Sequence, residues 1–319
     1  MTTKNKLITA SILSTSSIII TSLINKYIKM SAVSKNILSN SAESLKSIFH
    51  WRLGDIHYTK TGSGKPLLLI HDLDAASSSY EWHKIIPSLS KDYTVYTLDL
   101  LGCGQSEKPC LTYTNYVYVQ LISDFIKSKI GHRTDVIATG GSSSFVIMAC
   151  SNTPDLFNRL MLINPESISS CSHLPGIYSK YYKRFLDFPI TGTLLYHIAV
   201  SKKSLKDTFV NSYYAKPDFL KEAAIDAYYE SAHLGFSPKS VYACVRCNYT
   251  KCNITHALKK IDNSICILGG ENKPQIKEIM QEYISHNPAI EYSIVTSTNH
   301  LPQLEKPAEF LSNLTTFFA

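Results

Sequence analysis

Short apolar runs, each bounded by turn-forming residues, alternate with helix-like segments along most of the chain. A run of about five apolar residues between turn signals is typical of a strand that is buried on both faces. Strands that alternate with helices predict a largely parallel sheet with helices on both sides. The predicted strands are Arg52–Thr59, Pro66–Ile70, Thr94–Leu98, Asp135–Thr139, Leu160–Ile163, Ser264–Leu268 and Tyr292–Thr296, and the predicted helices are Tyr80–Ser90, Tyr113–Ile130, Phe145–Ser151 and Ala308–Phe318.

Residues 169–258 interrupt this alternation. They contain helix-like stretches and no convincing strand, so we expect a helical insertion within an α/β domain that spans 49–319. Ten of the twenty Tyr residues of the chain fall in this insertion. Two interpretations of these tyrosines stay open: they lie on amphipathic helices that pack on the core, or they form an apolar pocket wall edged with hydroxyl groups.

The first 48 residues differ in character from the rest. Residues 7–24 form an uncharged run of 18 residues with Lys on both sides, which reaches the length of a membrane-spanning helix. Eight of the 18 are Ser or Thr, whose hydroxyls can bond back to the helix backbone. We expect a single N-terminal membrane anchor within 1–48, followed by a linker at 31–47, with the folded domain on the cytoplasmic side. A cleaved signal peptide and an amphipathic arm are the alternatives.

The net charge of +7 on 319 residues raises the question of a nucleic-acid partner. Residues 1–46 hold six Lys against one Glu, so the other 273 residues carry only +2. We therefore expect no nucleic-acid partner for the folded part. The basic N-terminal segment instead predicts contact with a membrane surface.

Cysteine spacing bears on metal binding. Cys244, Cys247, Cys252 and His256 resemble a zinc-site pattern, but Val241–Asn248 has helical periodicity and the segment leads into an apolar strand. Reduced, buried thiols are the ordinary state of Cys in a domain of this size. We expect neither a metal nor another cofactor.

Four segments carry a resemblance to a known family. They read LLLIHD at 67–72, DLLGCGQS at 99–106, DLFNRLMLINP at 155–165 and NHLPQLEKP at 299–307. In this order they resemble the α/β-hydrolase fold superfamily, in which the first segment normally ends in His-Gly rather than His-Asp. The resemblance covers about 50–168 and 255–319. It implies a mostly parallel sheet flanked by helices, a variable helical lid, and a Ser, His and acid with an oxyanion hole.

In this family the nucleophile stands on a G-x-S-x-G turn between a strand and a helix, and the corresponding turn here reads ATGGSSSF at 138–145. Two registers are open. A gap-free count places Gly140, which has no side chain, at the nucleophile position, with Gly141 as an oxyanion donor and Ser142 close by. A register shifted by two makes Ser142 the nucleophile and Ser143 the oxyanion donor, with Leu73 as the second donor in both.

The resemblance assigns the catalytic His to His300, in the segment NHLPQLEKP. The position where the family carries its acid holds Lys273. A triad needs an acid to fix the tautomer of the His and to stabilise the imidazolium. Glu271, in the same loop, and Glu166, after the preceding strand, are the two candidates.

These assignments imply hydrolysis of a small or acyl ester. Ser142 attacks, His300 acts as base and then as acid, and Glu166 or Glu271 orients His300. The alternative is a membrane-tethered protein of the same fold that binds a ligand or partner without hydrolysis, because Gly140 and Lys273 replace the nucleophile and the acid. A third interpretation keeps His300 for acid–base chemistry without a covalent intermediate.

Overall fold

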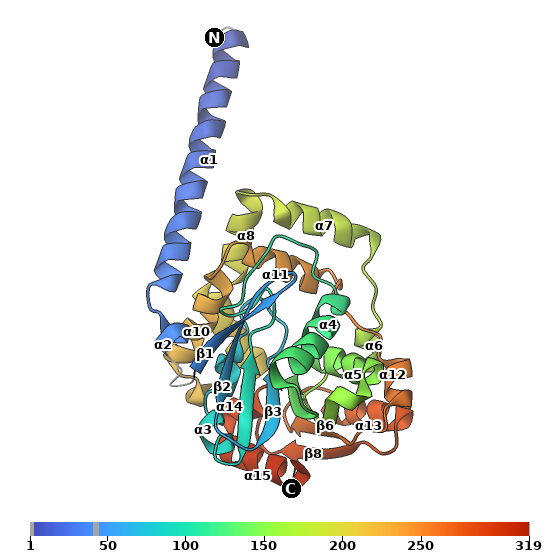
Figure 1. Ribbon diagram of the computed structural model, residues 1–319. Helices are drawn as coiled ribbons and strands as arrows, with labels where there is room; N and C mark the ends of the chain where they lie inside the picture. The colour runs from blue at the N-terminus through green and yellow to red at the C-terminus, as the bar shows by residue number, and fades with distance from the viewer. Residues whose placement is uncertain (1–2, 41–44, 319) are drawn as a thin grey trace.

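A computed structural model describes residues 3–40 and 45–318, with the backbone alone for 3–17, 39–40 and 45–46. Eight strands form one sheet in the order β1-β2-β4-β3-β5-β6-β7-β8 (Figure 1). β1 and β2 run antiparallel to their neighbours, and all pairs from β4 to β8 are parallel. The strands are β1 (Leu45–Trp51), β2 (Gly54–Thr61), β3 (Lys65–Ile70), β4 (Tyr93–Leu98), β5 (Thr134–Thr139), β6 (Phe157–Ile163), β7 (Ile265–Gly270) and β8 (Glu291–Val295).

Helices cover both faces of the sheet. Successive residues of a strand point to opposite faces, and the apolar strands therefore present side chains that must be buried on each face. Leu68 and Ile70 of β3 pack on the side of α4 (Asn115–Phe125) and α5 (Ser142–Asn152), whereas Leu67 and Leu69 pack on the side of α3 (Ile86–Leu89) and α15 (Pro307–Phe318). The mostly parallel sheet flanked by helices is therefore confirmed. These helices and their neighbours are η1 (Ser79–Trp82), α3 (Ile86–Leu89), α4 (Asn115–Phe125), α5 (Ser142–Asn152), α12 (Thr255–Lys260), α13 (Ile276–His286), α14 (Pro302–Glu305) and α15 (Pro307–Phe318).

Two predicted boundaries differ from the structure. The predicted helix over 80–90 is split into η1 and α3, and Pro87 stands at the start of α3, where its missing N–H costs nothing. β1 begins at Leu45, inside the predicted linker, because it forms a hairpin with β2 that pairs Trp51 with Gly54.

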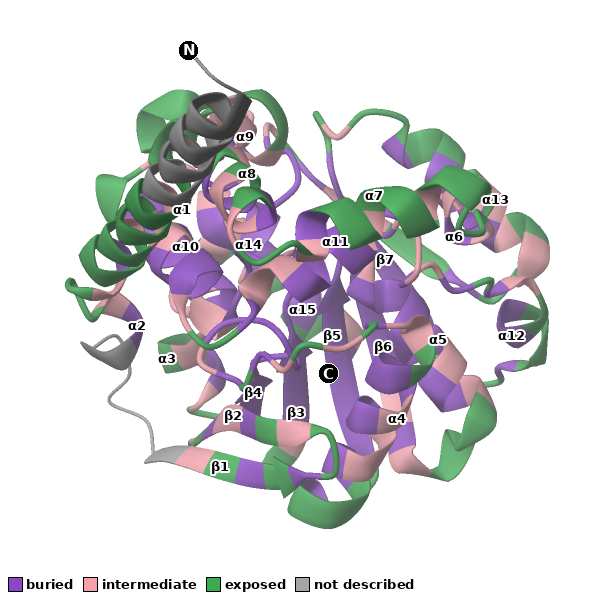
Figure 2. Cartoon of the chain, turned by 90° about the horizontal axis from the view of Figure 1, so that it is seen from above, coloured by how far each residue is buried: buried purple, intermediate pink, exposed green. Residues whose placement is uncertain are grey.

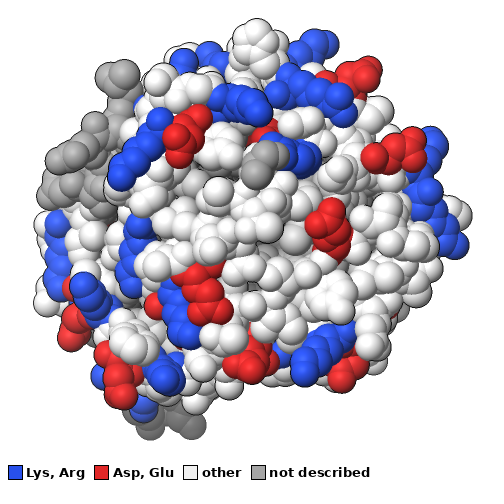
Figure 3. Space-filling view, turned by 90° about the horizontal axis from the view of Figure 1, so that it is seen from below, with Lys and Arg blue, Asp and Glu red and all other residues white. Residues whose placement is uncertain are grey.

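All the regular elements between β6 and β7 are helices. This helical segment lies above the carboxyl ends of the parallel strands, and α7 presents mostly exposed residues there (Figure 2). On the opposite side of the molecule, basic and acidic side chains are intermixed (Figure 3). The elements of the segment are α6 (Ile168–Cys171), α7 (Ile177–Asp187), α8 (Thr191–Ala199), α9 (Lys202–Thr208), η4 (Phe209–Tyr213), η5 (Pro217–Phe219), α10 (Glu222–His233) and α11 (Pro238–Arg246).

The prediction of an N-terminal membrane anchor, and with it of a membrane-anchored location, is wrong. α1 (Thr3–Val33) is continuous and is followed by α2 (Ile37–Asn40), but within the described part of the chain no helix is long and apolar enough to cross a membrane. The described half of α1 carries polar side chains that contact the helical segment: Asn25 donates to the Ile190 carbonyl and Lys29 to the Gly235 carbonyl. The side chains of residues 7–17, part of the expected anchor, lie outside the described residues.

Candidate active site

The turn between β5 and α5 is built on Gly140. Its φ is +56°, in the left-handed region that favours glycine, and its N–H donates to the Ile163 carbonyl over 2.9 Å. α5 begins at Ser142. The gap-free register therefore describes the turn, and the residue at its apex has no side chain.

The space in front of Gly140 is occupied by the carboxylate of Asp72. A Cβ atom added to Gly140 would lie 2.3 to 2.4 Å from the carboxylate atoms of Asp72, far inside van der Waals contact. Asp72 follows β3, at the position where the family normally has glycine. A side chain from this second loop thus replaces the side chain that the turn lacks.

Three hydrogen bonds hold the Asp72 carboxylate. Its Oδ1 accepts from the backbone N–H groups of Leu73, at 2.8 Å, and Gly141, at 2.9 Å. Its Oδ2 lies 2.8 Å from Nε2 of His300. Leu73 and Gly141 are the two donors that the resemblance assigns to an oxyanion hole in the gap-free register, and Oδ1 accepts from both.

This environment keeps Asp72 ionised. Burial by itself raises the pKa of a carboxyl group. The hydrogen bond from His300, the N–H of Gly141 and the charge of Lys273 outweigh burial, and the pKa of Asp72 lies below its usual value. Its side chain is 18% exposed, so one part of the anion faces open space.

His300 lies between Asp72 and Lys273. Its Nδ1 is 3.1 Å from Nζ of Lys273, and its ring stacks on Tyr213 with centroids 5.1 Å apart. An ammonium group can only donate, so charged Lys273 leaves the proton of His300 on Nε2, pointing at Asp72. A Ser-His-acid triad has the reverse arrangement, with the proton on Nδ1 and a lone pair on Nε2.

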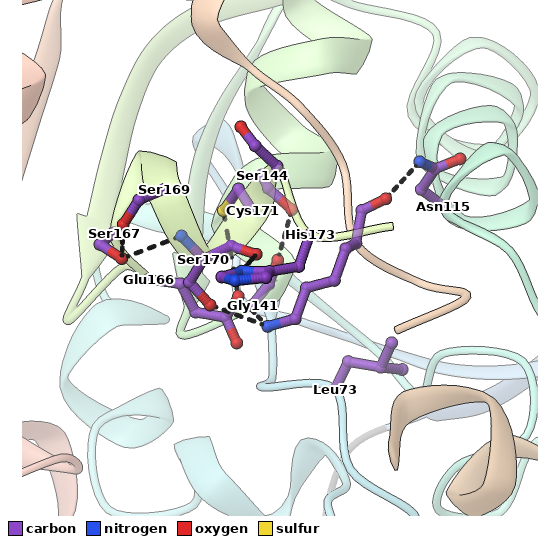
Figure 4. Close-up of polar contacts among 12 residues, drawn as sticks. Leu73, Asn115, Gly141, Ser144, Glu166, Ser167, Ser169, Ser170, Cys171 and His173 are labelled. Atoms are coloured by element: carbon purple, nitrogen blue, oxygen red, sulfur yellow. Dashed lines mark hydrogen bonds and ion pairs between the residues drawn. The ribbon is translucent and has the colours of Figure 1, made fainter. Parts of the chain in front are cut away.

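Neither predicted acid is brought to His300. Glu166 lies near Gly141 (Figure 4), and its Oε2 is 2.6 Å from Nζ of Lys251. Glu271 accepts from the backbone N–H of Ser297 at 2.7 Å. Lys273 occupies the place beside Nδ1 that a triad acid would take.

The structure also does not join Ser142 to His300. The Ser142 hydroxyl is fully buried and donates to the His71 carbonyl over 2.7 Å. The Ser143 hydroxyl donates to the Ala138 carbonyl over 3.2 Å. Both hydroxyls therefore bond to the backbone behind the turn, and we do not assign either residue to catalysis.

A cavity of about 130 Å³ opens over Asp72. Leu73, Gly141, Phe145 and Tyr213 are among its lining residues. A larger cavity of about 350 Å³ shares Tyr213 with it and is lined on its other side by the helical segment. Tyr228 and Tyr242 line that larger cavity, so three of the tyrosines face the space above the site.

The thiols of the zinc-like pattern are buried in the protein interior. Cys244, Cys247 and Cys252 are buried free thiols, and burial raises the pKa of Cys244 and of Cys252 to about 11. Among the described residues, His, Cys, Asp and Glu side chains form no group of three or more that could hold a metal ion.

Asp72 was missed by reasoning from the sequence, although a signal was present. His71-Asp72 stands where the family has His-Gly, and Gly140 stands where it has Ser. The two departures compensate each other in space, because an added Cβ at Gly140 and the carboxylate of Asp72 compete for one volume. Taken separately, Asp72 in place of glycine and Gly140 in place of serine each suggest only that catalysis has been lost.

Comparison with known proteins places this geometry in context. The model described as "Alpha/beta hydrolase family" matches residues 67–313. A soluble epoxide hydrolase of Corynebacterium sp. (strain C12) is 32% identical over 110 residues, which are 34% of this chain and 37% of that protein. The 2-hydroxy-6-oxo-6-(2'-aminophenyl)hexa-2,4-dienoic acid hydrolase of Metapseudomonas resinovorans is 37% identical over 118 residues, 36% of this chain and 40% of that protein.

The matched region thus spans less than half the length of these curated relatives. Among solved structures, an epoxide hydrolase, CorEH without ligand, superposes with a TM-score of 0.70 at 22% identity, covering 86% of this chain and 99% of that one. At this identity the likeness shows the fold.

Proposed function

Because the chain belongs to the alpha/beta hydrolase family, we propose that it is a hydrolase whose nucleophile is the Asp72 carboxylate. One observation carries the proposal: Oδ1 is held by two backbone N–H groups and Oδ2 by His300, in front of a turn that has no side chain of its own. Aspartate carboxylates act as covalent nucleophiles in enzymes, and the lowered pKa of Asp72 keeps it anionic.

The nucleophile changes the expected substrate from an ester to an epoxide. Attack of a carboxylate on an ester carbonyl gives an anhydride, a reactive acyl donor that returns readily to the starting ester. Attack on a strained epoxide carbon gives a stable ester that water can cleave. The similarity to an epoxide hydrolase supports this substrate class.

In the first step, Oδ2 of Asp72 forms a bond to an epoxide carbon, and the C–O bond of the ring breaks. The ring oxygen keeps the electron pair and takes the proton of Nε2 of His300. Nδ1 of His300 then accepts a proton from Lys273, which lies 3.1 Å away. Burial lowers the pKa of Lys273 while the charge of Asp72 raises it, so neutralising Asp72 favours this transfer.

The second step regenerates the carboxylate. Nε2 of His300 is now unprotonated and accepts a proton from a water that attacks Cγ of the ester. The negative charge on Oδ1 lies between the N–H groups of Leu73 and Gly141, where such donors stabilise it. The C–O bond to Cγ breaks, the diol takes the proton of Nε2, and the new carboxyl group returns a proton to the pair of Lys273 and His300.

Replacing Lys273 with Met tests the proton relay. The variant lacks the charge that lowers the pKa of Asp72, so Asp72 becomes protonated at a higher pH. We expect the acid limb of the kcat/KM profile to move to higher pH and kcat to fall about 10²-fold, as for loss of an acid–base group. Lys277→Met, a neighbouring charge change, is the control, and an unshifted acid limb in Lys273→Met would argue against the relay.

A substrate panel tests the proposed function. The full chain is incubated with styrene oxide, an alkyl bromide and a p-nitrophenyl ester, and diol, bromide and p-nitrophenol are measured. We expect diol formation to be fastest and a fluorophosphonate probe to leave the protein unlabelled. Ester turnover with probe labelling, and no diol, would overturn the proposal.

Binding without hydrolysis is the second candidate function. Two observations favour it: Oδ1 of Asp72 already accepts from the N–H groups of Leu73 and Gly141, and Lys273 lies where a triad needs an acid. A protein of this kind would turn over none of the three substrate classes and would still bind small molecules in the cavity above Asp72.

A further inference from the structure

A third cavity, of about 260 Å³, lies where α1 packs against the helical segment. Its walls come from α1, from α8, from the end of α10 and from the start of α11. It shares no lining residue with the two cavities above Asp72. Nothing in the reaction derived above uses it.

Two buried histidines in this cavity have ring nitrogens without a hydrogen-bond partner. His197 and His233 are 7% and 1% exposed, and their rings stack with centroids 4.9 Å apart. Nδ1 of His197 and Nε2 of His233 are both buried and unpartnered. Unpaired buried polar atoms are rare in proteins and require an explanation.

The protonation of His233 is fixed by its neighbour. Its Nδ1 lies 2.7 Å from the Tyr229 carbonyl, which can only accept, so the proton is on Nδ1. Nε2 is then a lone pair that needs a donor. Burial lowers the pKa of both histidines to about 4, so at neutral pH the missing partner is a donor such as a hydroxyl group.

Three lysines supply positive charge to the same cavity. Lys26, Lys29 and Lys239 line it. Lys29 donates to the Gly235 carbonyl, and Lys239 donates to the carbonyls of residues 187 and 188. These acceptors are neutral. The Asp187 carboxylate pairs with Lys183 and also attracts the charge of Lys239, so it offsets only part of the positive charge at the cavity. Tyr196, Phe236 and Pro238 supply the apolar part of the lining, beside the polar side chains of Asn25, Thr193 and Ser237.

We propose that this cavity binds a hydroxylated carboxylic acid with an apolar body. The hydroxyl group donates to Nε2 of His233, the carboxylate meets Lys26, Lys29 and Lys239, and the apolar body lies along Tyr196 and Phe236. Because α1 forms one wall, the ligand joins the N-terminal helix to the helical segment.

Calorimetric titration of the full chain tests the proposal with three probes: 3-hydroxyoctanoate, octanoate and octane-1,3-diol. We expect 3-hydroxyoctanoate to bind about tenfold more tightly than octanoate, which lacks the hydroxyl donor. The diol lacks the carboxylate and should also bind about tenfold more weakly, and added salt should weaken binding of the two acids only. Equal affinity for 3-hydroxyoctanoate and octanoate, or no binding of any probe, would overturn the proposal.

Two variants separate the two contacts. His233→Phe should lower the affinity for 3-hydroxyoctanoate to that for octanoate and leave octanoate binding unchanged, an outcome that misfolding cannot imitate. Lys26→Gln, an exposed position that folding tolerates, should weaken both acids and spare the diol, with Lys91→Gln as the matched surface control. If Lys26→Gln leaves the binding of both acids unaffected, the assigned carboxylate contact is wrong.

Asp72→Asn should not change any of the three affinities, because the two sites share no residue.

Discussion

Asp72→Asn is expected to abolish epoxide turnover, with kcat reduced about 10³-fold or more. The amide has the size of the carboxylate but no negative charge, and it cannot form the ester intermediate. It also presents an NH₂ group either to the N–H groups of Leu73 and Gly141 or to Nε2 of His300, all of which need an acceptor. Steady-state assay of purified variant and parent measures the loss.

Ser142→Ala is the control for this prediction. The Ser142 hydroxyl bonds to the His71 carbonyl in the core, so its loss should cost about 1 kcal/mol of unfolding free energy and leave kcat close to that of the parent. If Ser142 were the nucleophile, as the sequence predicts, Ser142→Ala would lose activity and Asp72→Asn would keep it. Activity that survives Asp72→Asn and disappears in Ser142→Ala would restore Ser142 as the nucleophile.

Gly140→Ala is expected to have the next largest effect. The added methyl group would lie 2.3 Å from the Asp72 carboxylate, so Asp72 must rotate away from Leu73, Gly141 and His300. Displacing a reacting group by about 1 Å can cost 10²-fold in rate, and we expect kcat to fall by at least about that factor. The same assay and a thermal melt measure both consequences.

Gly131→Ala separates the backbone effect from the clash. Gly131 also has a positive φ, +73°, but an added Cβ would meet nothing within 4 Å. Both variants strain a left-handed residue by about 1 kcal/mol, yet only Gly140→Ala should lose activity. Equal activity in the two variants would show that the Asp72 carboxylate does not need its present position.

Much of the fold could be predicted because its strands are strongly marked in the sequence. Runs such as Pro66–Ile70 are apolar throughout, since parallel strands are covered by helices on both faces. The hairpin of β1 and β2 was less visible because it lies at the sheet edge, where burial does not constrain every residue. The error at residues 7–24 came from length and lack of charge, which do not measure how apolar a helix with eight Ser and Thr is.

The site was predicted only in part, and for a physical reason. His300 follows a strand in a motif that resembles the family's segment, so a local pattern located it. Asp72, by contrast, comes from the loop after β3 and acts in front of a turn 69 residues later in the chain. A local sequence pattern cannot show that the side chain of one loop fills the space left by a glycine in a distant loop. The tautomer of His300 depends in turn on a third loop, which carries Lys273.

A single turnover in water labelled with the heavy oxygen isotope tests the central claim most directly. Enzyme in excess over styrene oxide is quenched after one turnover, and the diol and the peptide that contains Asp72 are analysed by mass spectrometry. If Asp72 is the nucleophile, its own oxygen leaves with the diol and the heavy oxygen appears in the Asp72 carboxylate. Heavy oxygen in the diol, with an unlabelled Asp72 peptide, would contradict the account.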